Sequence, residues 1–313
     1  MFASRSTLRR SAALSLAVTA SLALAACGSS GSSKPSNPLT GSSAKGTVVI
    51  GSANFPENEL LAQIYATALQ AKGVKVTDKF NIGSREVYYP EIKKGAVSII
   101  PEYNGTLLTV SVTPSSTAAT TAQVNAALQA GLPATMEILN SAPAQDSDSV
   151  TVTQAFAKAH NLTSIAQLQP IAHTMVFGGP PEFPTRSDGL KGLQKNYGVV
   201  FKSFDPLDES GPITLAALMS GKVQAADVFT TTPQIITDHL VSLSDPKFNF
   251  AAQNVTPLVY KPAMTPTIVD TLNAISAKLT TAELLQIDTA VIVNHDSYQA
   301  VATGWLKANG LPY

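Results

Sequence analysis

The chain has 313 residues, of which 44% are hydrophobic, 13% charged and 6% aromatic. This length accommodates two ordinary domains, and the apolar content is enough for a sizeable core, which excludes wholesale disorder. The 21 Lys and Arg residues balance 21 Asp and Glu residues, so no positive excess is present to bind the phosphate backbone of a nucleic acid.

Residues 1–26 have the organisation of an export signal. Three arginines (Arg5, Arg9 and Arg10) precede an apolar stretch that is too short to span a bilayer comfortably. The following Leu24-Ala25-Ala26-Cys27 resembles a bacterial lipobox, in which cleavage before the cysteine is followed by its lipid modification. Cys27 is the only cysteine, and a lipid anchor explains it without a disulfide, although a plain secretory signal with an incidental cysteine is the alternative.

A lipoprotein anchored on the extracytoplasmic face of the cell membrane is therefore predicted. Residues 27–46 are rich in Ser and Gly and predict a flexible tether between this anchor and a folded body.

The folded body begins with alternating strands and helices. Strands are predicted at 47–52, 74–76 and 97–100, and helices at 58–71 and 84–94. This β-α-β-α-β order implies parallel strands with helices on both faces. We expect the third strand to stop at Pro101, so that the turn residues beyond it face a ligand crevice: Glu102, Tyr103, Asn104 and Thr106. The alternative is an ordinary strand exit with a half-buried Tyr103.

A second set of elements follows a helix at 120–132 and a short apolar segment at 136–139. The polar segment 145–149 is interpreted as the crossing into a second domain. Beyond it we predict strands at 150–152, 173–178, 199–204 and 223–230, and helices at 154–160, 164–168, 189–197 and 212–220. Residues 248–259 would return the chain to the first domain, which closing helices at 267–279, 281–294 and 297–309 would complete.

The prediction is therefore an α/β clamshell of two lobes, each a mixed sheet flanked by helices. Lobe I comprises residues 47–147 and 254–313, and lobe II comprises residues 148–253. Tyr103 and Phe229 stand at matching places in the two lobes, each after a helix, a glycine and a short strand. Closure of a hinge would bring two aromatic faces around one ligand. Such faces attract cations by roughly 0.5–2 kcal/mol per contact, which suits a quaternary ammonium group. The alternative is that Phe229 belongs to the core and Tyr103 packs at the hinge.

Catalytic motifs are absent from the sequence. It has no His-Glu-x-x-His, no Gly-x-Ser-x-Gly and no Walker loop, and its four histidines are scattered. Asp146 and Asp148 could bind a cation or act as an acid–base pair, but a polar run of this kind is more typical of a loop. We expect no enzymatic activity, no cofactor and no metal.

Five short motifs together resemble the glycine betaine/choline/carnitine-type substrate-binding proteins of osmoprotectant ABC importers. They are Gly51-Ser52-Ala53-Asn54-Phe55-Pro56-Glu57, Gly83-Ser84-Arg85-Glu86-Val87, Pro101-Glu102-Tyr103-Asn104-Gly105-Thr106, Glu182-Phe183 with Arg186-Ser187-Asp188-Gly189-Leu190, and Asp227-Val228-Phe229-Thr230-Thr231. The resemblance implies a periplasmic-binding-protein fold and a monomeric receptor. It implies capture of a small solute between the lobes and delivery to a membrane permease driven by a separate ATPase.

The resemblance also implies roles for particular residues. Tyr103 and Phe229 would form part of an aromatic cage, Thr106 and Arg186 would hold the ligand carboxylate, and Asp146 would be the acid near the crossing. The predicted ligand-binding set is completed by Asn104 and Phe55 and by three positions where this sequence departs from the family pattern. Ala53 replaces a lysine, Asp148 replaces a cage tyrosine, and Gln253 replaces an aromatic residue.

Because the predicted cage has fewer aromatic residues than the family pattern, more than one class of ligand is compatible with the sequence. A compatible solute of the glycine betaine, choline or carnitine class is the first hypothesis. The second is the same receptor retuned to a polyol or to another small polar or aromatic metabolite. A cell-wall lipoprotein enzyme is the third.

Overall fold

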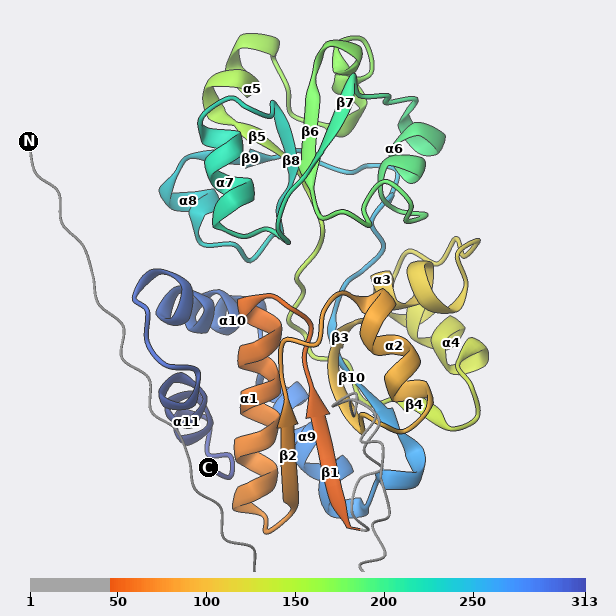
Figure 1. Cartoon of the computed structure of the whole chain (residues 1–313), viewed down its shortest axis with the longest axis vertical. Helices are drawn as coiled ribbons and strands as arrows, with labels where there is room; N and C mark the ends of the chain where they lie inside the picture. The colour runs from red at the N-terminus through yellow and green to blue at the C-terminus, as the bar shows by residue number, and fades with distance from the viewer. Residues whose placement is uncertain (1–45) are drawn as a thin grey trace, which may run out of the picture. The chain divides into compact units, whose positions relative to one another are not determined.

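A computed structural model describes residues 46–313. The predicted export signal, Cys27 and residues 27–45 of the tether lie outside these residues. Two five-stranded sheets organise the described chain, one in each lobe (Figure 1). Both sheets are mixed, and helices flank each of them, as predicted from the sequence.

The sheet of lobe I has the strand order β2-β1-β3-β10-β4. Strand β1 (Thr47–Gly51) is parallel to β2 (Lys75–Lys79) and β3 (Ile99–Tyr103). Strand β10 (Val255–Tyr260) is antiparallel to β3 and to β4 (Met136–Ile138). The N-terminal strands and the returning chain therefore build one sheet, although more than 150 residues separate β3 from β10 in sequence.

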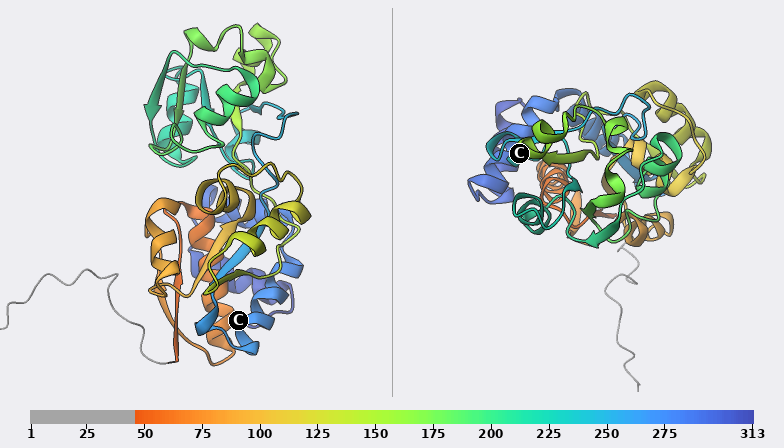
Figure 2. Two further views of the ribbon diagram at one scale, coloured as in Figure 1. Left: turned by 90° about the vertical axis from the view of Figure 1, so that its right-hand side faces the viewer. Right: turned by 90° about the horizontal axis from the view of Figure 1, so that it is seen from above.

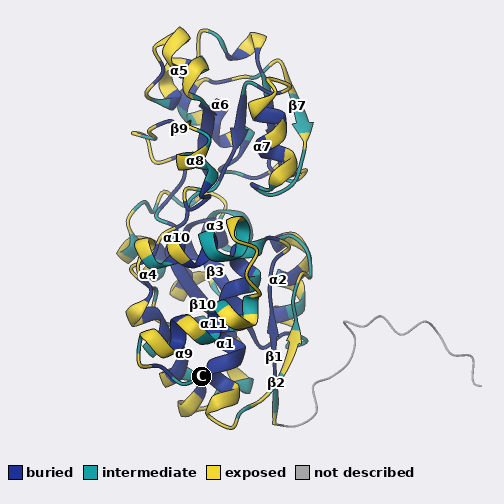
Figure 3. Cartoon of the chain, turned by 90° about the vertical axis from the view of Figure 1, so that its left-hand side faces the viewer, coloured by how far each residue is buried: buried dark blue, intermediate teal, exposed yellow. Residues whose placement is uncertain are grey.

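Helix α1 (Pro56–Ala71) forms because its apolar residues recur at helical spacing, and almost all of them are buried in the core of lobe I. It lies beside α11 (Tyr298–Ala308), as Figure 1 shows. The other helices of this lobe are α2 (Arg85–Lys93), α4 (Thr121–Gly131), α9 (Pro266–Lys278) and α10 (Thr281–Asp288). In Figure 3 the inner strands β1, β3 and β10 are buried, whereas the edge strand β2 and the outer faces of the helices are largely exposed.

The sheet of lobe II has the order β7-β6-β8-β5-β9. Strand β6 (Val176–Gly179) is parallel to β7 (Ser203–Pro206) and β8 (Ala225–Asp227), whereas β5 (Val150–Thr153) is antiparallel to β8 and to β9 (Leu240–Ser242). The helices here are α5 (Gln154–His160), α6 (Leu190–Tyr197), α7 (Pro212–Met219) and the short α8 (Gln234–Thr237).

Two chain segments connect the lobes, and both are visible in Figures 1 and 2. One runs from β4 to β5 and the other from β9 to β10. They lie side by side, since Gln145 and Asn254 form an antiparallel bridge and the amide of Asp146 donates to the carbonyl of Gln253 at 3.1 Å. The predicted lobe boundaries at 147/148 and 253/254 fall within these segments and stay predictions.

The predicted stop of the third strand at Pro101 is wrong, because β3 continues to Tyr103. Pro101 faces Pro257 in the antiparallel ladder with β10. The amide of Tyr260 donates to Ser98 and the amide of Asn104 donates to Asn254. Hydrogen-bonded and non-hydrogen-bonded pairs alternate along such a ladder, so the proline pair is a non-bonded one. The missing N–H groups therefore remove no bond between these two strands.

Other boundaries also differ from the predictions. The turn expected at 104–106 is a helical turn, α3 (Asn104–Thr106), continued by a π-helical turn at Leu107–Val112. The strand expected at 173–178 begins only at Val176, after the short helical turn Ala172–Thr174. β7 lies later than the expected 199–204, and β8 covers only part of the expected 223–230. β9 and α8 were not predicted, since each is very short.

Candidate ligand-binding site

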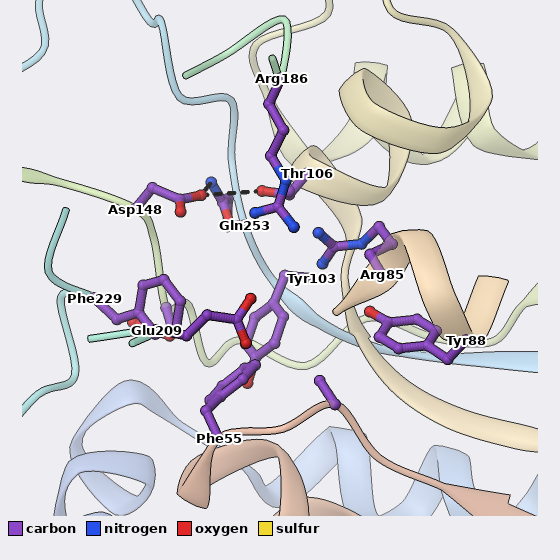
Figure 4. A pocket seen from close by; sticks show the side chains of 12 residues that line it. Phe55, Arg85, Tyr88, Tyr103, Thr106, Asp148, Arg186, Glu209, Phe229 and Gln253 are labelled. Carbon is purple, nitrogen blue, oxygen red and sulfur yellow. Dashed lines mark hydrogen bonds between the residues drawn. The ribbon is translucent and has the colours of Figure 1, made fainter. Parts of the chain in front are cut away.

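A pocket at the junction of the two lobes gathers residues from distant parts of the chain (Figure 4). Its lining consists of Ala53, Phe55, Arg85, Tyr88, Tyr103, Thr106, Asp146, Asp148, Arg186, Glu209, Phe229 and Gln253. Nine of these belong to the set of ten predicted from the sequence. The tenth, Asn104, does not line the pocket, because its side chain bonds Asn125 and the backbone amide of Asn254. Glu102 does not line it either.

Three aromatic rings form one wall of the pocket. Phe55 immediately precedes α1, Tyr103 ends β3, and Phe229 follows β8 in the other lobe. The ring centroid of Phe55 lies 5.9 Å from that of Tyr103 and 5.1 Å from that of Phe229. Phe229 also packs against the core of lobe I, so it joins the two lobes at this wall.

The position of Tyr103 is set by a buried carboxylate behind it. The Tyr103 hydroxyl donates to Glu57 at 2.5 Å, and the hydroxyl of Thr231 from lobe II donates to the other oxygen of Glu57 at 2.6 Å. Burial and the nearby charge of Glu57 raise the pKa of Tyr103 well above its usual value, so the phenol stays protonated. Glu57 therefore ties the aromatic wall to the opposite lobe.

Two arginines lie opposite each other on the polar side of the pocket. Arg85, the first residue of α2, binds Glu102 through Nε at 3.0 Å and Nη2 at 2.9 Å. Arg186, in lobe II, binds Glu86 of lobe I through Nε at 3.0 Å and Nη2 at 3.1 Å, and Glu182 at 3.3 Å. The two guanidinium groups point toward one another in Figure 4.

Both guanidinium groups keep one nitrogen for a ligand. Within residues 46–313 the Nη1 atom of neither Arg85 nor Arg186 makes a hydrogen bond to protein. Both side chains are almost fully buried, and the positive charge of Arg85 repels that of Arg186. An anion between two such cations is favourable, and guanidinium geometry suits a carboxylate.

The remaining polar residues of the pocket bond one another. Asp148 accepts from the Thr106 hydroxyl at 3.2 Å and from Nε2 of Gln253 at 2.9 Å. Asp146 accepts from the amide of Thr231 at 3.0 Å. The pKa of Asp146 is raised, first by burial and then by the charge of Glu57. The predicted departures at 148 and 253 thus form one hydrogen-bonded unit.

Three lining residues were not predicted from the sequence: Arg85, Tyr88 and Glu209. Arg85 stands in one of the motifs that carried the family resemblance, and this was the one signal that could have identified it. Tyr88 lies three residues further along the same helix and donates to Glu102 at 2.8 Å. Glu209 lies in a polar loop between β7 and α7, where no periodic pattern distinguishes it from other surface acids.

The space left among these side chains is small. The cavity has a volume of about 30 Å³, whereas typical small-molecule sites measure roughly 300–1,000 Å³. Further contacts hold the lobes together beside it, including a 2.6 Å hydrogen bond from Thr109 of lobe I to Asp188 of lobe II. A ligand therefore enters this pocket only when the lobes separate or a lining side chain moves.

Two α/β lobes joined by paired crossing segments around one aromatic and charged pocket define a solute-binding protein of the clamshell class. Residues 46–308 match the family described as the substrate-binding domain of the ABC-type glycine betaine transport system, and the chain belongs to this family. It is thus an extracytoplasmic solute receptor of an ABC importer, and the predicted resemblance is confirmed. Within the described residues, none of the helices has the length and hydropathy needed to cross a bilayer.

Curated relatives agree with this assignment. The chain is 27% identical over 289 residues to the glycine betaine-binding protein YehZ of Escherichia coli (strain K12), covering 84% of this chain and 90% of that protein. It is 25% identical over 277 residues to a glycine-betaine-binding protein of Pseudomonas aeruginosa, covering 85% and 88% of the two chains.

Solved structures show the same fold. The structure of a glycine betaine/carnitine/choline ABC transporter protein matches with a TM-score of 0.64 and 20% identity, covering 84% of this chain and 98% of that one.

Proposed function

We propose that this receptor captures a small quaternary ammonium compound of the glycine betaine, choline or carnitine class and delivers it to the permease. The observation that carries the proposal is the wall of Phe55, Tyr103 and Phe229 around one pocket, with ring centroids 5.1 and 5.9 Å apart. A trimethylammonium group donates no strong hydrogen bond and is attracted to aromatic faces, most strongly where water is excluded.

The polar side of the pocket supports a place for the other end of the ligand. A ligand carboxylate would bind Nη1 of Arg186, with the Thr106 hydroxyl beside it, as the family resemblance implies. The facing Nη1 of Arg85 would supply the second cation that the replacement of lysine by Ala53 removed. Asp148 and Gln253 would line this end through their mutual hydrogen bond. Phe55 would pack between the rings of Tyr103 and Phe229, and Asp146 would bind Thr231 of the opposite lobe beside them.

A ligand panel tests the proposal. Purified protein is titrated by calorimetry and by thermal shift with glycine betaine, choline, carnitine and a polyol. We expect the quaternary amines to bind and to raise the melting temperature, and Tyr103→Ala to weaken the binding and reduce the shift. Tyr313→Ala is the matched control, because Tyr313 is exposed at the C-terminus, away from the pocket. Absence of any response to the quaternary amines at millimolar concentration would refute the ligand class.

A receptor for a polyol or another small polar metabolite is the second candidate. The favouring observation is the hydrogen-bonded unit of Asp148, Thr106 and Gln253, in which Asp148 and Gln253 stand where aromatic residues were expected. Stabilisation by polyols and not by quaternary amines would establish it. An enzymatic role has no support from the family, and we propose that the bound ligand leaves chemically unchanged. Recovery of the ligand intact after prolonged incubation tests this.

We further propose that Cys27 carries a lipid anchor and that the receptor is monomeric. The observation that carries the proposed anchor is the lipobox-like sequence before the single cysteine. Cells expressing the full chain should incorporate labelled palmitate into the protein, and Cys27→Ser should abolish the labelling. The soluble body should elute as a monomer when light scattering is measured across the chromatographic peak.

A further inference from the structure

Glu209 occupies a position in the pocket that no motif predicted. It lies in the loop between β7 and α7 of lobe II. Its side chain extends into the pocket between the rings of Phe229 and Tyr103, above Phe55 (Figure 4). Its Oε2 atom is buried and has no hydrogen-bond partner among residues 46–313. A buried carboxylate oxygen without a partner is costly, so it marks a place where a partner of opposite charge is favourable.

Titratable groups from several elements face this carboxylate. Arg186 and Glu182 approach from the loop after β6, Arg85 and Tyr88 from α2, and Asp227 from β8. Burial first, and then Glu182, raise the pKa of Glu209 to about 8, although Arg186 and Arg85 oppose the shift. Each arginine is bound to another carboxylate through Nε and Nη2, and among residues 46–313 Glu209 forms no direct ion pair with either of them.

We propose that Glu209 is a specificity-determining residue whose carboxylate, ionised when a cation binds among the aromatic rings, favours a cation without a carboxylate over a zwitterion. This inference rests on the proposed quaternary ammonium ligand. The carboxylate of Glu209 lies where the cationic head of such a ligand would meet the rings of Phe55, Tyr103 and Phe229. It also lies below the arginine pair, where it competes with a ligand carboxylate for the same positive charge.

The chemistry gives opposite expectations for two ligands with the same head group. Choline carries a trimethylammonium group and a hydroxyl, and its charge is matched by Glu209. Glycine betaine carries the same group and a carboxylate, which Glu209 repels. The two ligands therefore separate an effect on charge from an effect on the aromatic wall, because the rings treat both head groups alike.

The test is calorimetric titration of the purified protein at pH 8.5 with choline and with glycine betaine. We expect Glu209→Gln to weaken choline binding at least tenfold and to leave glycine betaine binding unchanged or tighter. Glu209→Ala should shift the preference in the same direction. Asp205→Asn is the matched control, because Asp205 is an acid of the neighbouring strand whose partner is the exposed Lys222. Thermal unfolding without ligand verifies that each variant is folded.

A pH series gives a second readout. Choline binding to the wild-type protein should tighten as the pH rises from 6.5 to 8.5. The cation binds the ionised form of Glu209, so at the lower pH the proton on Glu209 must be released before choline binds. Glu209→Gln should flatten this dependence. Equal changes for choline and glycine betaine in Glu209→Gln, or changes below twofold, would overturn the inference while leaving the proposed function intact. Failure of the wild-type protein to bind any quaternary amine would overturn both.

Discussion

The hydroxyl of Tyr103 donates a 2.5 Å hydrogen bond to the carboxylate of Glu57, which is buried behind the aromatic wall. The same carboxylate accepts a hydrogen bond from Thr231, which belongs to the opposite lobe. One side chain thus positions a ring of the proposed ligand wall and contacts the lobe that closes over it. This arrangement connects ligand binding to closure, and it can be tested from each side.

Substitutions at Tyr103 separate the ring from the hydroxyl. Tyr103→Ala removes a cation–π contact of about 0.5–2 kcal/mol, so binding of a quaternary amine should weaken by roughly 2–30-fold. Tyr103→Phe keeps the ring and loses the hydrogen bond to Glu57, so its effect should be smaller. Calorimetry with glycine betaine and choline measures both. Equal losses in the two variants would show that the hydroxyl, and not the ring, governs binding.

Thr231→Val tests the bond between the lobes. A hydrogen bond to a charged acceptor contributes about 1.5–3 kcal/mol, and this one forms only when the lobes are together. We expect ligand affinity to fall about tenfold, with little change in the unfolding of either lobe. Thr237→Val is the control, since the hydroxyl of the exposed Thr237, the last residue of α8, donates to the neighbouring Asp238 and not to the other lobe. Unchanged affinity in Thr231→Val would mean that this bond does not contribute to closure.

The pair of Arg85 and Glu102 should be a major determinant of stability. Glu102 is fully buried, and Arg85 is its ion-pair partner at 2.9 Å. Arg85→Met would leave that carboxylate uncompensated and should destabilise the protein by about 3–5 kcal/mol in urea unfolding. The double variant Arg85→Met with Glu102→Gln should recover part of the loss. Lys94→Ala, which breaks an exposed pair with Glu91, should cost less than about 1 kcal/mol. A smaller loss in Arg85→Met than in Lys94→Ala would contradict this ranking.

Stability without ligand should fall as the pH rises. Burial raises the pKa of Asp188 to about 6 and that of Glu209 to about 8, and it also raises the pKa of Asp227, whose two carboxylate oxygens are buried without hydrogen bonds among residues 46–313. Because these folded-state pKa values lie above the unfolded ones, the folded protein holds protons that the unfolded chain releases. For Asp188 and Glu209 the stabilisation is complete below about pH 4 and is lost progressively up to about pH 8.

Thermal unfolding between pH 5 and pH 9 measures this dependence. The melting temperature should decline across the range, and Asp227→Asn should reduce the slope and raise stability at pH 8. The exposed Asp270→Asn is the control and should leave the slope unchanged. A wild-type melting temperature that rises with pH would contradict the sign.

Local patterns in the sequence were sufficient for the main elements. The helical spacing of apolar residues located α1, α9 and α11. Gly73 and Gly95 marked the ends of α1 and α2. The matching positions of Tyr103 and Phe229 indicated that both lobes contribute to one aromatic pocket, and both residues do line it. The predicted strand end at Pro101 was wrong because a proline usually ends a strand, whereas here its place in the ladder with β10 needs no donor.

The sequence by itself determined the two-lobed class and most of the pocket positions, because periodicity, turn chemistry and short motifs are local properties of the chain. Only the tertiary structure decided the charges of the site. Arg186 binds Glu86 and Thr231 binds Glu57 across 100 and 174 residues, and Glu209 enters the aromatic wall from an unpatterned loop. Such pairings depend on how the lobes and sheets bring distant segments together, and the electrostatic energy of a buried charge depends on those neighbours.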